Sequence, residues 1–100
     1  MLEVLEGIQI QSADEEIVYS VTTTNWGSDP SSVSVVAYEE GNPEPVTATV
    51  FPVNSPAIVE DTIMLSPLKA LTAGKAYRIE VKFTSGSNIY ECYFRVHCLF

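Results

Sequence analysis

The strongest structural signal in this sequence is the stretch Leu71-Thr72-Ala73-Gly74-Lys75-Ala76-Tyr77-Arg78-Ile79-Glu80-Val81-Lys82-Phe83, followed by a Ser85-Gly86-Ser87-Asn88 turn and a last segment from Tyr90 to Phe100. Apolar and polar residues alternate on both sides of the turn, which is the pattern of strands with one buried face. The stretch therefore predicts two antiparallel strands joined as a hairpin. The inward residues are Ile79, Val81 and Phe83 before the turn, and Cys92, Phe94, Val96 and Cys98 after it.

The same alternation recurs along the rest of the chain, and Gly, Pro, Asn, Asp and Ser separate the segments. In the segment at 4–11 we expect Ile8 and Ile10 to face inward. The segment at 32–39 is apolar on both faces, which predicts a central strand. Together the pattern predicts one all-β domain spanning residues 1–100, built as a single antiparallel β-sandwich of seven or eight strands. The remaining expected strands lie at 16–23, 46–50, 57–59 and 62–65.

Charge and hydropathy exclude two classes of partner. Five basic residues face 13 acidic ones, a net charge of −8, which repels phosphate backbones and anionic lipid surfaces. No apolar run approaches the roughly 20 residues needed to cross a bilayer. We therefore expect neither nucleic acid nor membrane as a partner. The opening residues lack the basic and apolar regions of a signal peptide, which predicts synthesis in the cytoplasm without export.

The segment around Tyr77 resembles a known structural motif. Leu71-x-x-Gly74-x-x-Tyr77, followed by Arg78-Ile79-Glu80-Val81, is similar to the corner that leads into the penultimate strand of fibronectin type III and other immunoglobulin-like modules. The resemblance implies that the Tyr77 hydroxyl bonds to the backbone a few residues upstream, that Gly74 permits the turn and that Leu71 fills the core beneath it. The sequence departs from antibody-type domains, because it has no tryptophan in the second strand and no inter-sheet cysteine pair.

The chain as a whole is also similar to small bacteriophage virion proteins of the tail-fibre adaptor type. The Asn25-Trp26-Gly27 loop and the Leu71 to Phe83 segment carry this likeness. It implies a structural protein that is made in the cytoplasm and assembled into a virion.

The cysteines and the histidine are the residues best suited to chemistry. Cys92 and Cys98 lie six positions apart on one expected strand, about 20 Å at roughly 3.3 Å per residue, too far for a disulfide. We expect free thiols facing the core. His97 falls on the opposite face of that strand, so the three cannot share a zinc ion or form a thiol and base pair. No catalytic motif occurs in the sequence, and we expect no enzyme activity, no metal and no cofactor.

Acidic residues gather at expected strand ends, in the groups Asp14-Glu15-Glu16, Glu39-Glu40 and Glu60-Asp61. Sandwich modules can bind calcium at such ends. The spacing lacks the dense Asp-x-Asp pattern of a calcium loop, and solvated turns that discourage edge pairing explain the acids more simply.

Aromatic residues are the candidates for partner contact. Trp26 lies in an expected end loop, where it either anchors a partner or folds back to close the core. Tyr90 and Tyr93, with Leu99 and Phe100, either form an exposed apolar patch or pack across strands. The apolar C-terminal pair suggests a subunit contact.

Function follows from these features only as a class. We expect a non-enzymatic structural or assembly module, a phage or prophage virion component that contacts copies of itself or a neighbouring protein. The alternative is a carbohydrate- or peptide-binding module in which Trp26 stacks with Tyr19 or Tyr38 against the ligand. An enzyme accessory or calcium-dependent adhesion domain is a third reading.

Overall fold

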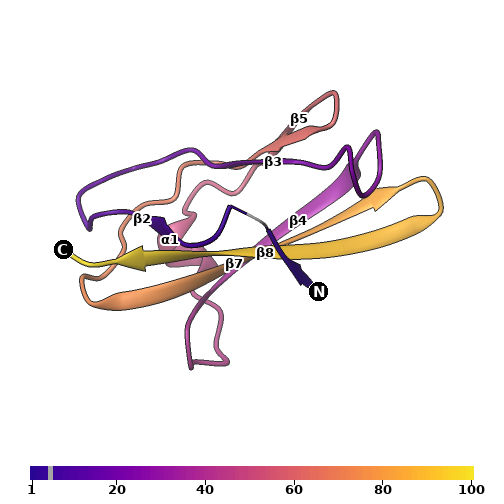
Figure 1. The fold of residues 1–100 in the computed structure, drawn as a ribbon. Coiled ribbons are helices and arrows are strands. Elements are labelled where there is room, and N and C mark those ends of the chain that lie inside the picture. The colour runs from indigo at the N-terminus through magenta and orange to yellow at the C-terminus, as the bar shows by residue number, and fades with distance from the viewer. Residues whose placement is uncertain (5) are drawn as a thin grey trace.

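The computed structural model describes residues 1–4 and 6–100, and only the backbone of Leu2. Two sheets make up nearly all of its regular structure (Figure 1). The larger sheet has the order β1-β8-β7-β4, with β2 also paired to β8, and the smaller has the order β3-β6-β5. The expected all-β class is therefore confirmed. The elements are β1 (Leu2–Glu3), β2 (Gln9–Ile10), β3 (Ser20–Thr22), β4 (Ser31–Glu39), α1 (Thr47–Val50), β5 (Ala57–Val59), β6 (Thr62–Met64), β7 (Lys75–Ser85) and β8 (Asn88–Cys98).

The β7–β8 hairpin is the longest feature of the fold and spans most of the molecule (Figure 1). Its antiparallel register runs without interruption from Lys75 opposite Cys98 to Ser85 opposite Asn88. Gly86 begins the two-residue turn with a positive φ of 59°, as the first residue of a type II′ turn requires. The predicted hairpin and its inward residues are confirmed. The inward residues of both strands are buried: Tyr77, Ile79, Val81, Phe83, Cys92, Phe94, Val96 and Cys98.

The N-terminal segment differs from the expectation of one antiparallel strand. β1 and β2 both pair in parallel with β8, Leu2 opposite Cys92 and Gln9 opposite Val96. The large sheet is consequently mixed, because the segment runs alongside the last strand in the same direction.

The inward facing of Ile8 and Ile10 is wrong. Both are exposed, by 43% and 51%, while Gln11 is fully buried. The Gln11 amide donates to the carbonyl oxygens of Leu68, at 2.7 Å, and Glu15, at 2.9 Å. Its oxygen accepts a bond from the Tyr19 hydroxyl at 3.0 Å. These three bonds offset the desolvation of the amide. In this segment it is therefore Gln11 that faces the core, and not the isoleucines.

Two expectations about the middle of the chain are also wrong. β4 is an edge strand and not a central one, and the expected strand at 46–50 is the single helical turn α1. α1 lies against β4, where the Ala37 N–H donates to the Thr47 side-chain oxygen at 3.0 Å. The turn buries Val50 and the following Phe51. The helical turn therefore covers part of the edge of β4 that no strand of the described residues pairs with.

The small sheet follows the sequence pattern closely. β5 and β6 meet at a Glu60-Asp61 turn as expected, with Val59 opposite Thr62. β3 lies on the other side of β6, with Val21 opposite Ile63. Ile17, Tyr19 and Val21 are more buried than the residues between them, which confirms the predicted facing of this segment. α1 is four residues long, and no helix in the described part of the chain could cross a membrane.

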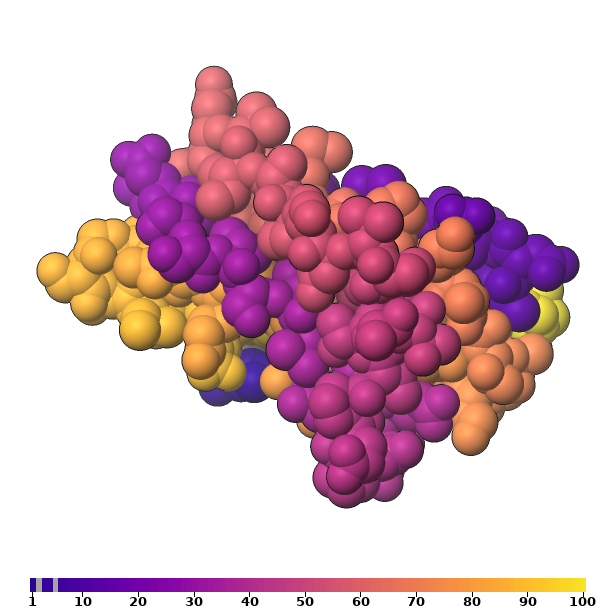
Figure 2. All heavy atoms as spheres, turned by 180° about the vertical axis from the view of Figure 1, so that it is seen from behind, coloured from indigo at the N-terminus to yellow at the C-terminus, as the bar shows by residue number. Residues whose placement is uncertain are grey.

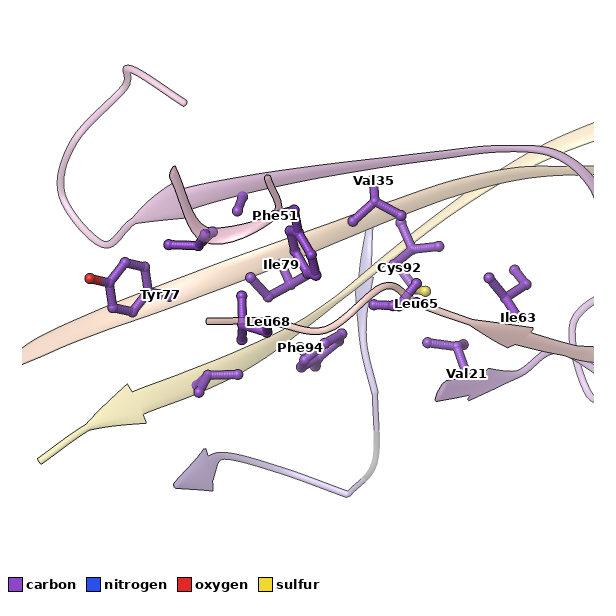
Figure 3. Close-up of a cluster of buried hydrophobic side chains, with 14 of the residues drawn as sticks. Val21, Val35, Phe51, Ile63, Leu65, Leu68, Tyr77, Ile79, Cys92 and Phe94 are labelled. Carbon is purple, nitrogen blue, oxygen red and sulfur yellow. The ribbon is translucent and has the colours of Figure 1, made fainter. Parts of the chain in front are cut away.

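The core draws side chains from both sheets. Figure 3 shows Tyr77 at one end of the buried cluster and Val21 and Ile63 at the other, with Ile79, Phe51 and Leu68 between them. The two sheets thus share one hydrophobic core, a sandwich-like arrangement.

The corner before β7 is held by a hydrogen bond between the backbone of Thr72 and the side chain of Tyr77. The backbone N–H of Thr72 donates to the Tyr77 hydroxyl at 2.8 Å, and Leu71 is buried beneath. Gly74 has a φ of 86°, which favours glycine, and its N–H donates to the carbonyl of Cys98 at 2.7 Å. The corner is therefore hydrogen-bonded to the C-terminal end of β8.

Removing the Tyr77 hydroxyl tests this contact. Tyr77→Phe leaves the Thr72 N–H without its acceptor, which we expect to lower the free energy of unfolding by about 1 kcal/mol. For a domain of this size the melting temperature then falls by about 4–8 °C, measurable by circular dichroism. Tyr93→Phe is the matched control, because no hydrogen bond to the Tyr93 hydroxyl occurs among the described residues. Equal melting temperatures for both variants would contradict the assignment.

Candidate functional site

Trp26 folds back onto the core and is half-buried. Its ring stacks on Phe83 with centroids 6.3 Å apart. The loop lies so close to β7 that a Cβ on Gly27 would meet the Ser85 Cβ at 2.6 Å, and the Ser85 hydroxyl donates to the Ser28 carbonyl at 2.6 Å. Glycine at position 27 therefore allows the loop to hold the indole against the end of the core.

The three aromatic candidates do not form one surface. Tyr90 points inward and stacks on Phe83 at 5.6 Å, beside Trp26. Tyr93 lies on the opposite face of β8, between Glu3 of β1 and Glu80 of β7. Leu99 and Phe100 are exposed beyond the other end of β8. Of the two alternatives for Tyr90, Tyr93, Leu99 and Phe100, a single shared patch does not form, because alternation along β8 sends the two tyrosines to different faces.

The outer face of the large sheet is charged, and four of its charged residues form two ion pairs, Arg95 with Glu3 and Arg78 with Glu80. Arg95 contacts the Glu3 carboxylate at 2.8 and 3.4 Å. The Arg78 Nε lies 2.9 Å from Glu80 in a geometry too poor for a hydrogen bond. The Arg78 guanidinium also lies 5.5 Å from the centre of the Tyr38 ring. Lys82 and Glu91 lie opposite one another on this face, and both are exposed with no ion pair among the described residues.

The outer face of the small sheet has the opposite character. Its strands β3, β6 and β5 contain no charged residue. The register places Ser20, Met64 and Ala57 in one row and Thr22, Thr62 and Val59 in the next. We call these six residues, together with Val18, the uncharged face. Val59, Val18 and Met64 are exposed by 58%, 51% and 41%, and the β5–β6 turn stands out at the top of Figure 2.

The free edge of β3 is a second feature of the small sheet. The Tyr19 carbonyl accepts from Leu65 and the Thr23 N–H donates to Asp61, so these residues bond toward β6. Because bonding direction alternates along a strand, the N–H and C=O groups of Ser20 and Thr22 point away from β6. Within the described residues no strand pairs with this edge.

A pocket of about 520 Å³ opens beside that edge. Trp26, Tyr19 and Phe94 supply aromatic surface, and Glu3 and Glu6 supply carboxylates. A volume in this range, apolar walls and a few polar groups are typical of ligand sites. Tyr38 belongs to the outer face of the large sheet, so only Tyr19 of the two expected stacking partners joins Trp26. The remaining lining residues are Val4, Gln9, Ser20, Val21, Thr22 and Asn25.

The two cysteines and His97 lie on opposite faces of one strand, as the alternation of the sequence predicts. Cys92 and Cys98 are free and buried on one face of β8, and His97 is on the other. In the described ranges no three His, Cys, Asp or Glu side chains are placed to hold a metal ion. Among the acids, Asp61 accepts from the Thr24 hydroxyl at 3.1 Å and from the Asp29 N–H at 3.0 Å, which fastens the loop before β4.

Comparison of the chain with protein-family models, curated proteins and solved structures found no match in any of the three. The uncharged face and the pocket therefore supply the functional argument. The sequence pointed to Trp26 and Tyr19, which line the pocket, but the uncharged face was missed, although the run Val18, Ser20, Thr22 was a visible sign of an uncharged strand face.

Burial gives Cys92 a pH-dependent contribution to stability. Desolvation raises the pKa of its thiol from 9.0 to about 11. The folded protein then holds this proton more tightly than the unfolded chain does, so the contribution is complete below about pH 9 and disappears as the pH rises to 11. We expect the free energy of unfolding, measured in urea, to fall over this range. Cys92→Ala should have a shallower decline, and an unchanged slope would count against a raised thiol pKa. Part of the decline should remain in both the unmodified protein and Cys92→Ala, because burial and the nearby Glu15 carboxylate also raise the pKa of Tyr19.

Proposed function

We propose that this chain is a non-enzymatic structural or assembly module that acts through lateral contact with copies of itself. The uncharged face carries the proposal. Its exposed Val59 and Met64 lie on strands that contain no charge, and the exposed Val18 lies just before β3, in a protein with a net charge of −8. Exposed apolar residues grouped on one face are characteristic of contact surfaces.

Charge explains why this face suits a second copy. Two chains with eight excess negative charges each repel one another at most orientations. The strands of the uncharged face bring no charge of their own to such a contact, and the contact buries valine and methionine side chains, which contribute favourably in proportion to the apolar area removed from water.

The order of strands supports an immunoglobulin-like assignment of the fold. In constant-type immunoglobulin domains the second, fifth and fourth strands form one sheet and the third, sixth and seventh form the other. Counting the N-terminal segment as the first strand, β3-β6-β5 and β8-β7-β4 follow this order. The bond from Thr72 to Tyr77 occurs where such domains have their tyrosine corner. The N-terminal segment departs from the pattern, since it pairs with β8 alone.

A virion component is the setting we propose for the module. The likeness of the Asn25-Trp26-Gly27 loop and the Leu71 to Phe83 segment to small phage proteins supports it. The identity of the neighbouring genes tests this setting: capsid or tail genes would support it, and metabolic or secretory genes would exclude it.

Self-association is tested by mass. We expect the purified protein to have a mass above 11.0 kDa at tens of micromolar in sedimentation velocity. Association should strengthen when the NaCl concentration is raised from about 20 mM to about 300 mM, because salt screens the repulsion between the copies. Val59→Glu should return the protein to a monomer.

Ile89→Glu is the matched control for that experiment. Ile89 is also exposed but lies at the β7–β8 turn, away from the small sheet, so its variant should keep the mass of the unmodified protein. If the protein is a monomer at all salt concentrations, even at about 100 µM protein, self-association is refuted. An equal effect of both substitutions would place the contact elsewhere.

A ligand-binding module is the second candidate, and the pocket between Trp26 and Tyr19 favours it. An aromatic pocket of this kind accommodates a sugar ring or an apolar peptide side chain. A monomer in which soluble sugars shift the fluorescence of Trp26, the single tryptophan, would favour this function over assembly.

A further inference from the structure

We infer that the free edge of β3 and the adjoining pocket form a binding site for an extended peptide segment of a partner protein, with apolar residues at alternate positions and basic residues on either side of them. The inference rests on the pocket and on the backbone groups of this edge, and not on the side chains of the uncharged face. It specifies the ligand and how the backbone would be recognised.

The backbone of β3 supplies the first part of the site. Ser20 and Thr22 direct their N–H and C=O groups away from β6, toward the side on which the pocket opens. An extended segment placed there can pair with both residues, as peptides do when they add a strand to an open sheet edge. The N-terminal segment leaves this place free because β1 and β2 pair with β8.

The pocket supplies the second part. Val21 of β3 and Phe94 of β8 belong to the core, so the pocket reaches the flank of the core between the two sheets. Alternate side chains of an added strand would point into this flank, against Trp26 and Tyr19. The site therefore selects large apolar residues at every second position.

The charge of the rim supplies the third part. Glu3 and Glu6 both line the pocket. Glu3 is paired with Arg95, whereas Glu6 is exposed and has no ion pair among the described residues. Together with the net charge of −8, this rim attracts a basic segment and repels an acidic one.

The experiment uses the blocked peptide acetyl-Lys-Leu-Thr-Leu-Lys-amide as the probe, with the full protein. We expect the fluorescence of Trp26 to shift on titration, and nuclear magnetic resonance to show at least about tenfold slower hydrogen exchange at the Ser20 and Thr22 amides at saturation. The amide of Ile58 is an internal control on the other edge of the sheet. The analogue with glutamate in place of lysine should bind at least about tenfold more weakly.

Two N-methylated peptides test whether the probe binds as a strand. Methylation at the threonine or at both leucines blocks opposite edges of an extended peptide, so one analogue should lose binding and the other retain it. Equal binding by both, or a fluorescence shift without slower exchange at Ser20 and Thr22, would overturn the inference. Absence of any shift at millimolar peptide would do the same.

Ser20→Pro removes an N–H that points away from β6 and should abolish binding. Ile58→Pro is the matched control. Ile58 lies opposite Ile63, whose backbone groups bond to Val21, so the Ile58 N–H faces the free edge of β5. That variant should bind the probe normally if folded by circular dichroism, and the N-methylated peptides remain decisive if either variant fails to fold. If the unmodified protein self-associates but does not bind the peptide, this inference fails and the proposed self-association stands.

Discussion

The antiparallel ladder between β7 and β8 is the interaction on which the large sheet is built, and its inward side chains form the wall against which the small sheet packs. Each strand has 11 residues, and their alternate side chains form one wall of the core. β4 pairs with β7, while β1 and β2 pair with β8. At one end Gly74 bonds to Cys98, and at the other Gly27 packs against Ser85. A rigid hairpin thus fixes both end loops and leaves the small sheet to present its outer face and edges.

Much of this fold could be predicted because the period of two is a local property. It identified β7, β8, β5 and β6 and the facing of β3. It failed where a distant contact decides the outcome. Val46 to Val50 alternates as well as any strand, yet burial of Val50 and Phe51 against β4 favours a helical turn. Gln11 reverses the expected facing of its segment, since its hydrogen bonds reach Leu68, 57 positions away.

The candidate site was less predictable than the fold. Sequence pointed to Trp26 and Tyr19 as aromatic surface, and the structure brings both to one pocket. The sequence analysis grouped Tyr90 with Tyr93, but the two are three positions apart on β8 and their side chains therefore lie on opposite faces of the sheet. The open edge of β3 has no local signature, because it results from the N-terminal segment choosing β8 as its partner. Such a choice depends on which edge offers the better register and the Arg95 to Glu3 ion pair, and neither can be read from alternation.

The pairing of β1 with β8 also has a consequence for the order in which the chain can fold. Leu2 lies opposite Cys92, a separation of 90 positions, so the large sheet is incomplete until β8 has been made. At about 5–20 residues per second, the N-terminal segment waits roughly 5–18 s for its partner strand. During synthesis the small sheet and its edges can form first, and contacts of such long sequence separation slow the final step.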